Sequence, residues 1–287
     1  MGRFYNNFKT ALLLSLLTAL VLWIGSLFGT GGLYIALVMA AVMNFVSFFF
    51  SDKIAIMAMR AQEVGPEHEL YGIVEGLVRR AELPMPRVYV APHDAPNAFA
   101  TGRSPTHAAV CATEGLLRML SREEIAGVMA HELAHVKHRD ILIQSVATTI
   151  GGAISMLGYV FMFGGGRSRD GEGVNPLAGL AVLILGPLAA GLIQAAVSRS
   201  REFDADRGGA EMLGSAMPLA TALEKIHLAS QRIPMDVNPA FNSLFIAEPR
   251  NTFERAMHLF ATHPPLEQRL MKLIGRESTG TFGRRAA

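Results

Sequence analysis

The sequence of 287 residues contains three long stretches without a charged side chain. Asp, Glu, Lys and Arg make up 17% of the residues, and none of them occurs in the ranges 10–51, 141–166 and 173–198. A helix of about 20 apolar residues is long enough to cross the core of a bilayer. The missing charges therefore predict four transmembrane helices, the first two joined by a flexible turn at "GTGG" (29–32); these helices lie near 10–28, 33–50, 142–163 and 177–197.

Two other interpretations of these apolar runs are weaker. Buried core helices of a soluble protein seldom stay uncharged over such lengths. A cleaved signal peptide would explain the first run, since "MGRFYNNFK" is a plausible basic start. That run is too long for a typical signal peptide, however, and no small-residue cleavage site stands out before the second run begins. We therefore expect the first helix to be a retained anchor.

The sequence also has little cysteine and no basic stripe. Cys111 is the single cysteine, so no internal disulfide can form, which suits a reducing compartment. The formal net charge is only +2. We therefore expect no nucleic-acid partner.

Basic residues gather at one end of the expected helices. They precede the first and third helices and follow the second and fourth: Arg3, Lys9, Lys53, Arg60, Lys137, Arg139, Arg199, Arg201 and Arg207. Basic flanks prefer the cytoplasm. We therefore expect both termini and the polar segments 51–140 and 198–287 to be cytoplasmic, separated by membrane hairpins at 1–50 and 141–197. The two polar segments can then build one site together.

The segment from Ser121 to His138 carries a pattern typical of a metal-binding helix. Ser121 followed by Glu124 is a capping box. Further along, His131, Glu132 and His135 form an H-E-x-x-H motif. Residues four apart lie on one helical face, so both imidazoles can reach one ion. Glu132 projects to the side, where it can contact a water molecule rather than the metal.

Two histidines leave a third ligand to be found, because a catalytic zinc usually has three protein ligands. A metzincin would continue with a glycine and a third histidine, but His138 and Ile141 occupy those positions, which excludes that class. His138 is one candidate ligand, although the helix has advanced too far by this point for easy convergence. We interpret it as a surface residue.

The better candidate follows the fourth apolar run, in "SRSREFDADR" (198–207). Glu202 and Asp206 are four residues apart, so on a helix they share a face. One carboxylate can bind the metal while the other accepts the free N–H of a ligand histidine. Asp204 points to another face and is expected to be solvated.

Together these motifs resemble the HtpX-type membrane zinc metalloproteases, bacterial relatives of the CAAX-prenyl endoprotease. The resemblance rests on "HELAH" between the second and third helices, "EFDAD" after the fourth, "NAFATG" at 97–102 and "THPP" at 262–265. It implies an α+β membrane protein whose four transmembrane helices carry a mainly helical, gluzincin-like cytoplasmic protease domain with a small β-sheet.

The resemblance also implies roles for individual residues. One Zn²⁺ would be bound by His131, His135 and Glu202. Glu132 would be the general base, and Asp206 would hold a ligand histidine. His263, from "THPP", would stabilise the oxyanion. Asn97, Ala98 and Phe99 would belong to an edge strand that binds extended substrate.

The pattern of residues supports a small sheet before the metal helix. "RVYV" at 87–90 alternates and "AAVCA" at 108–112 is an apolar run, both typical of strands. The segment 97–101 between them is either a strand or a loop. Strand addition of a peptide requires an exposed sheet edge, which a sequence does not display.

The expected activity is hydrolysis of peptide bonds close to the membrane. From His135 to Gln144 is nine residues, roughly 13–14 Å in a helix, so the metal should lie just above the cytoplasmic membrane face. The family resemblance implies quality control at the bacterial inner membrane, with damaged membrane proteins as substrates. The alternatives are a non-hydrolytic scaffold with structural zinc, and a channel or transporter. The expected spans carry only mildly polar residues such as Asn44, Gln144 and Gln194, which disfavours transport.

Overall fold

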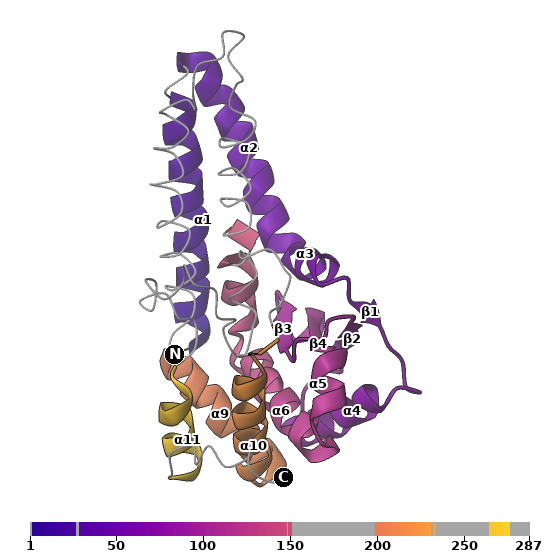
Figure 1. Cartoon of the computed structure of the whole chain (residues 1–287). Coiled ribbons are helices and arrows are strands. Elements are labelled where there is room, and N and C mark those ends of the chain that lie inside the picture. The colour runs from indigo at the N-terminus through magenta and orange to yellow at the C-terminus, as the bar shows by residue number, and fades with distance from the viewer. Residues whose placement is uncertain are drawn as a thin grey trace.

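The computed structural model describes residues 2–26, 29–147, 149–150, 199–230, 232–233 and 264–275 (Figure 1). A hairpin of two long helices, α1 (Gly2–Ser26) and α2 (Gly29–Phe49), extends from a part made of shorter helices and one sheet. The protein is mostly helical, with a small mixed sheet. This agrees with the expected α+β class.

The two long helices pack closely at the end where they join. A Cβ atom at Gly25 would lie 2.2 Å from the Cβ of Ala36 and 2.8 Å from the carbonyl oxygen of Gly32. Further along, Asn44 Nδ2 donates a hydrogen bond to Thr18 Oγ1 at 2.7 Å. The expected turn at 29–32 is wrong, because α2 already begins at Gly29. Small residues there serve close helix packing, as they commonly do in membrane helices.

Within the described residues, α2 is the one helix long and apolar enough to cross a membrane, and α1 carries a shorter apolar stretch, Phe8–Trp23. Four transmembrane helices are therefore not confirmed. The expected fourth span lies outside the described residues, as does most of the third. Residues 141–147 and 149–150 are helical, and Ile143, Val146 and Ile150 pack in a common core with the hairpin.

The sheet contains β1 (Gln62–Glu63), β2 (Arg87–Ala91), β3 (Ala98–Gly102) and β4 (Ala108–Thr113) in the order β1-β2-β4-β3. The β2–β4 pair is parallel, and the other two pairs are antiparallel. The segment left open between strand and loop is thus a strand, and it is one of the two edge strands, β1 being the other. Both of the other expected strands are confirmed.

Alternating residues of the sheet enter two different cores. Val88 and Val110 face a large core built with α4 (Glu69–Ala81), α6 (Arg122–His138) and α10 (Met217–Ser230). Tyr89, Phe99 and Cys111 face a smaller core with α3 (Ser51–Ala58). The short α5 (Glu114–Met119) links β4 to α6. Because α6 packs against the sheet, α4 and α10, it is buried along most of its length.

Two further helices complete the described part, α9 (Arg199–Leu213) and α11 (Leu266–Ile274). The backbone of α9 lies directly against α6. A Cβ atom at Gly209 would be 2.9 Å from the backbone nitrogen of His131, and one at Gly208 would be 3.1 Å from the Cβ of Ala134. The glycines allow this close approach, which brings the carboxylates of α9 within reach of the histidines of α6.

Candidate metal centre

Helix α6 begins as its sequence predicts. Ser121 is the N-cap, its hydroxyl accepts from the Glu124 backbone N–H at 3.3 Å, and the Glu124 carboxylate accepts from the Ser121 N–H at 2.8 Å. Lys225 of α10 also binds Glu124, at 2.8 Å. The helix ends where Arg139 adopts a left-handed conformation with φ of 62°. The expected helix and capping box are confirmed.

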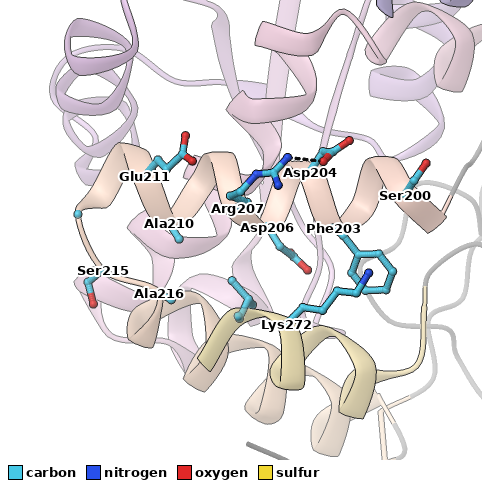
Figure 2. A pocket seen from close by; sticks show the side chains of 12 residues that line it. Ser200, Phe203, Asp204, Asp206, Arg207, Ala210, Glu211, Ser215, Ala216 and Lys272 are labelled. Atoms are coloured by element: carbon cyan, nitrogen blue, oxygen red, sulfur yellow. Dashed lines mark hydrogen bonds and ion pairs between the residues drawn. The ribbon is translucent and has the colours of Figure 1, made fainter. Parts of the chain in front are cut away.

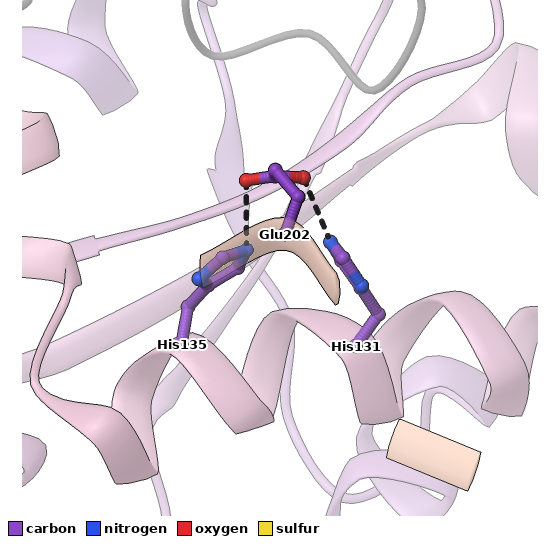
Figure 3. A group of neighbouring side chains, drawn as sticks. All are labelled: His131, His135 and Glu202. Atoms are coloured by element: carbon purple, nitrogen blue, oxygen red, sulfur yellow. Dashed lines mark ion pairs between the residues drawn. The ribbon is translucent and has the colours of Figure 1, made fainter. Parts of the chain in front are cut away.

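Three side chains from two helices converge on one point (Figure 3). The carboxylate of Glu202 on α9 lies between the two histidines of α6: Oε2 is 3.7 Å from His131 Nε2, and Oε1 is 3.4 Å from His135 Nε2. The ligand atoms all lie within 4.8 Å of one another. All three residues are buried. This group is the one that the sequence predicted as the metal ligands.

The spacing of these atoms fits a metal ion. Zinc bonds to imidazole nitrogen and carboxylate oxygen are about 2.1 Å long, so two ligands of a tetrahedral ion lie roughly 3.4 Å apart. The two nitrogen–oxygen distances, 3.4 Å to Oε1 and 3.7 Å to Oε2 of Glu202, are close to that separation. Two imidazoles and one carboxylate are also a donor set that zinc commonly has in hydrolases. The residues present therefore fit the ion.

A second carboxylate holds the far nitrogen of each histidine. Asp206 Oδ1 lies 2.9 Å from His131 Nδ1, and Asp140 Oδ2 lies 3.4 Å from His135 Nδ1. A carboxylate at Nδ1 favours a proton there, which leaves Nε2 as the electron-pair donor facing the centre. The sequence predicted Asp206 in this position. It missed Asp140, which the left-handed turn at Arg139 brings back toward the helix.

Arg269 of α11 completes this arrangement. Its Nε and Nη2 donate to the two oxygens of Asp206 at 2.9 and 2.6 Å. The side chain is only 2% exposed, so a full positive charge is buried beside the centre. Sequence reasoning missed Arg269. The signal that could have found it is weak: a basic residue on a short helix after "THPP".

The electrostatics of the centre favour a cation. Burial alone would raise the pKa of Asp206, but the Arg269 guanidinium outweighs it and holds the pKa well below its usual range. Burial would lower the pKa of His135, yet Glu202 and Asp140 together raise it to about 10. The carboxylates around the histidines thus stabilise positive charge at this point.

The remaining predicted site residues have different positions. Glu132 is buried on α6 beside the ligand histidines. Asp204 is 49% exposed and pairs with Arg207 at 2.6 Å, and His138 is exposed, as expected. Neither is part of the metal-ligand group. His263 lies outside the described residues.

Edge strand β3 lies beside α6, and its register with β4 decides which of its main-chain groups point toward β4. The Thr113 N–H donates to the Asn97 carbonyl at 2.9 Å, so Asn97 and Phe99 direct their main-chain groups toward β4. By the same alternation, the main-chain groups of Ala98 and Ala100 point away from β4. All three residues of the predicted substrate segment are buried, and Asn97 is also held by the Thr113 hydroxyl at 2.9 Å.

A cavity of about 810 Å³ lies between α9, the residues just before α10, and α11 (Figure 2). Lys272 Nζ lies 3.4 Å from the ring centre of Phe203 at this cavity. Asp206 borders it, but His131, His135 and Glu202 do not. The cavity is therefore separate from the metal centre.

A buried pair of histidines on an H-E-x-x-H helix, joined by a carboxylate from a second helix, defines a metallopeptidase-type site. Known proteins agree with this class. The model of the Peptidase family M48 matches residues 65–277. The Protease HtpX homolog of Burkholderia ambifaria is 50% identical over 284 residues, which cover 97% of this chain and 99% of the relative. That of Methylibium petroleiphilum is 52% identical over 276 residues, or 94% and 97%.

Among solved structures, the crystal structure of S. mikatae Ste24p aligns with a TM-score of 0.51 at 21% identity. The alignment covers 94% of this chain and 66% of that chain, and it concerns the fold. The chain belongs to peptidase family M48. It is a membrane metalloprotease, so the predicted family and enzyme class are confirmed.

Proposed function

We propose that this metalloprotease is a zinc-dependent endopeptidase in which His131, His135 and Glu202 bind one Zn²⁺ and Glu132 is the general base. The observation that carries the proposal is the convergence of one ligand atom from each of the three residues within 4.8 Å. The two oxygens of Glu202 lie 3.4 Å from His135 Nε2 and 3.7 Å from His131 Nε2. Bound zinc supplies a Lewis acid that polarises the scissile carbonyl and acidifies water.

The chain's own residues supply the proton transfers and the orientation. Glu132 accepts a proton from the attacking water and then delivers it to the leaving amine. Asp206 and Asp140 keep the ligand imidazoles in the tautomer that presents Nε2. Arg269 holds Asp206 through two parallel hydrogen bonds. His263 stays a sequence-based proposal as a donor to the oxyanion.

We further propose that extended substrate pairs with the free edge of β3. Strand addition uses main-chain groups that no neighbouring strand occupies, and those of Ala98 and Ala100 point away from β4. At the far end of the strand, the Gly102 N–H already donates to Ser145 Oγ at 3.2 Å. Substrate pairing would therefore involve the part of the strand between Asn97 and Thr101.

Removing the Ser145 hydroxyl should weaken substrate binding. Ser145 Oγ also bonds the Thr101 hydroxyl at 2.7 Å, so Ser145→Ala leaves two buried polar groups of β3 without this partner. We expect KM for an extended peptide to rise roughly three- to tenfold, with kcat within about twofold, because uniform binding is lost. Steady-state kinetics measure this split.

The matched control is Thr149→Val, one turn along the same helix. The Thr149 hydroxyl donates to the backbone carbonyl of Ser145 at 2.9 Å, within its own helix. This variant should keep the wild-type KM. Equal KM values in wild type and Ser145→Ala would contradict substrate pairing at this edge.

The proposed location is the cytoplasmic face of the bacterial inner membrane. The helix from residue 141 starts just after α6 and packs into the core of the α1–α2 hairpin, which supports a site at the base of the membrane helices. The basic flanks of the apolar runs support the cytoplasmic side. In this arrangement 1–50 and 141–197 are membrane hairpins, and 51–140 with 198–287 form the catalytic part. Substrates at this height would be loops and frayed ends of damaged membrane proteins, as in quality control.

Metal removal tests the proposed cofactor. Detergent-purified enzyme treated with a chelator should lose at least about 99% of its casein-degrading activity, because neither water nor carbonyl is then activated. Adding one equivalent of Zn²⁺ after dialysis should restore it. Metal content is measured alongside by inductively coupled plasma mass spectrometry. Full activity in metal-free enzyme would overturn the proposal.

A further inference from the structure

A second pocket lies where α2 ends and α3 begins, and its residues are distant in sequence from the metal ligands. It has a volume of about 450 Å³ and is lined by residues of α2, α3 and the turn between β3 and β4. Three phenylalanines of the last turns of α2 and the α2–α3 junction form its apolar wall: Phe45, Phe49 and Phe50. All three are exposed, by 55%, 42% and 39% of their surface.

Two basic side chains lie close to the faces of these phenylalanine rings. Lys53 Nζ lies 5.3 Å from the ring centre of Phe50, and the guanidinium carbon of Arg103 lies 5.8 Å from that of Phe49. Within the described part of the chain, neither cation pairs with a carboxylate. Asp52, the one acid among the described lining residues, is bound at 2.8 Å by Arg87. Among its described lining residues, the pocket therefore presents two positive charges without a carboxylate partner.

The position of the pocket indicates the kind of anion. Helix α2 is apolar and long enough to span a membrane, and long basic side chains near the end of such a helix reach the level of the lipid headgroups. Basic pockets beside membrane helices attract anionic headgroups. A phosphate diester also suits a guanidinium and an ammonium together.

We propose that this pocket binds the phosphate group of an anionic phospholipid, with Lys53 and Arg103 as its cationic ligands. This proposal depends on the proposed function in one respect, namely that α2 crosses the membrane. It concerns a site built by residues that take no part in hydrolysis.

The test is lipid binding by the full chain in detergent micelles, measured by native mass spectrometry. The chain carries Glu132→Gln, so that self-cleavage does not interfere and lipid binding is measured separately from hydrolysis. The probes are dioleoyl phosphatidylglycerol, dioleoyl phosphatidylcholine and sn-glycerol 3-phosphate. The last one carries a phosphate group without acyl chains.

The test variant is Lys53→Gln with Arg103→Gln, and the matched control is Arg79→Gln with Arg80→Gln on the exposed side of α4. Each removes two positive charges. A basic residue at an anionic membrane surface contributes roughly fivefold in affinity. We therefore expect the dissociation constant for phosphatidylglycerol to rise about 25-fold in the test variant and to stay unchanged in the control.

Four results would overturn the proposal. In the first, the test variant binds phosphatidylglycerol as tightly as the control does. In the second, the parent Glu132→Gln chain binds phosphatidylcholine as tightly as phosphatidylglycerol. In the third, only glycerol 3-phosphate binding depends on the two cations, which assigns the pocket to a free phosphate ester. The charge-preserving pair Lys53→Arg with Arg103→Lys should bind phosphatidylglycerol within about fivefold of the parent chain. Loss of binding there would also count against the proposal, since both charges remain.

Discussion

Glu132→Gln is expected to lower the rate of casein hydrolysis by about 10²–10⁴-fold, the usual contribution of a general base. Glutamine has the shape of glutamate but cannot accept the proton of the attacking water. Glu132 is not among the three residues whose ligand atoms converge. The variant should therefore still bind one zinc ion per chain, which elemental analysis of the same preparation measures.

A matched control separates catalysis from a general effect of charge on the helix. Glu123→Gln removes an exposed carboxylate from the first turn of the same α6, and its activity should stay within about twofold of wild type. If Glu132→Gln hydrolyses casein as fast as this control, Glu132 is not the base. If Glu132→Gln loses activity and also binds no metal, the loss comes from the site as a whole rather than from proton transfer.

Arg269→Leu is expected to lower the free energy of unfolding by about 3–5 kcal/mol, because it leaves the buried carboxylate of Asp206 without its partner. Both oxygens of Asp206 bind the guanidinium in the native protein. Denaturant titration of the detergent-solubilised chain, followed by circular dichroism, measures the change. Lys272→Leu removes an exposed cation from the same α11 and should cost far less.

A double variant shows whether the loss comes from the ion pair. Asn at position 206 carries no charge but can still accept from His131, so Asp206→Asn with Arg269→Leu should be less destabilised than the two single losses combined. Zinc affinity provides a readout beyond stability. Arg269→Leu should weaken it about 10–100-fold, as loss of an outer partner of a ligand histidine commonly does. Additive losses and an unchanged zinc affinity would contradict this role for Arg269.

The sequence was informative wherever the pattern is local. The capping box at Ser121 and the four-residue spacing of His131 and His135 depend only on helix geometry. Glu202 and Asp206 share a helical face for the same reason, so the sequence could place them as a pair. The structure brings this pair to the histidines through Gly209, whose backbone contacts that of His131.

The missed residues have no such local pattern. Asp140 reaches His135 because Arg139 adopts a left-handed conformation that ends α6. Arg269 is 63 residues from Asp206, and an arginine on an amphipathic helix is usually solvated. Burial and geometry, rather than residue type, distinguish it.

The turn expected at "GTGG" failed for a related reason. Glycine favours turns locally, but it also lets two membrane helices approach closely. The close approach of Gly25 to Gly32 and Ala36 shows that the glycines here serve helix packing. A local preference was outweighed by packing between helices.

By itself the sequence determined the metal helix, the family and the apolar character of the N-terminal helices, because short-range spacing and the absence of charge directly constrain helices and membrane insertion. Only the tertiary structure decided which side chains hold the ligand histidines, which strands form the edges of the sheet and that Lys53 and Arg103 lie at the end of α2. Those features depend on contacts between segments far apart in the chain. Such contacts are fixed by how the helices and the sheet pack, which single-sequence patterns do not encode.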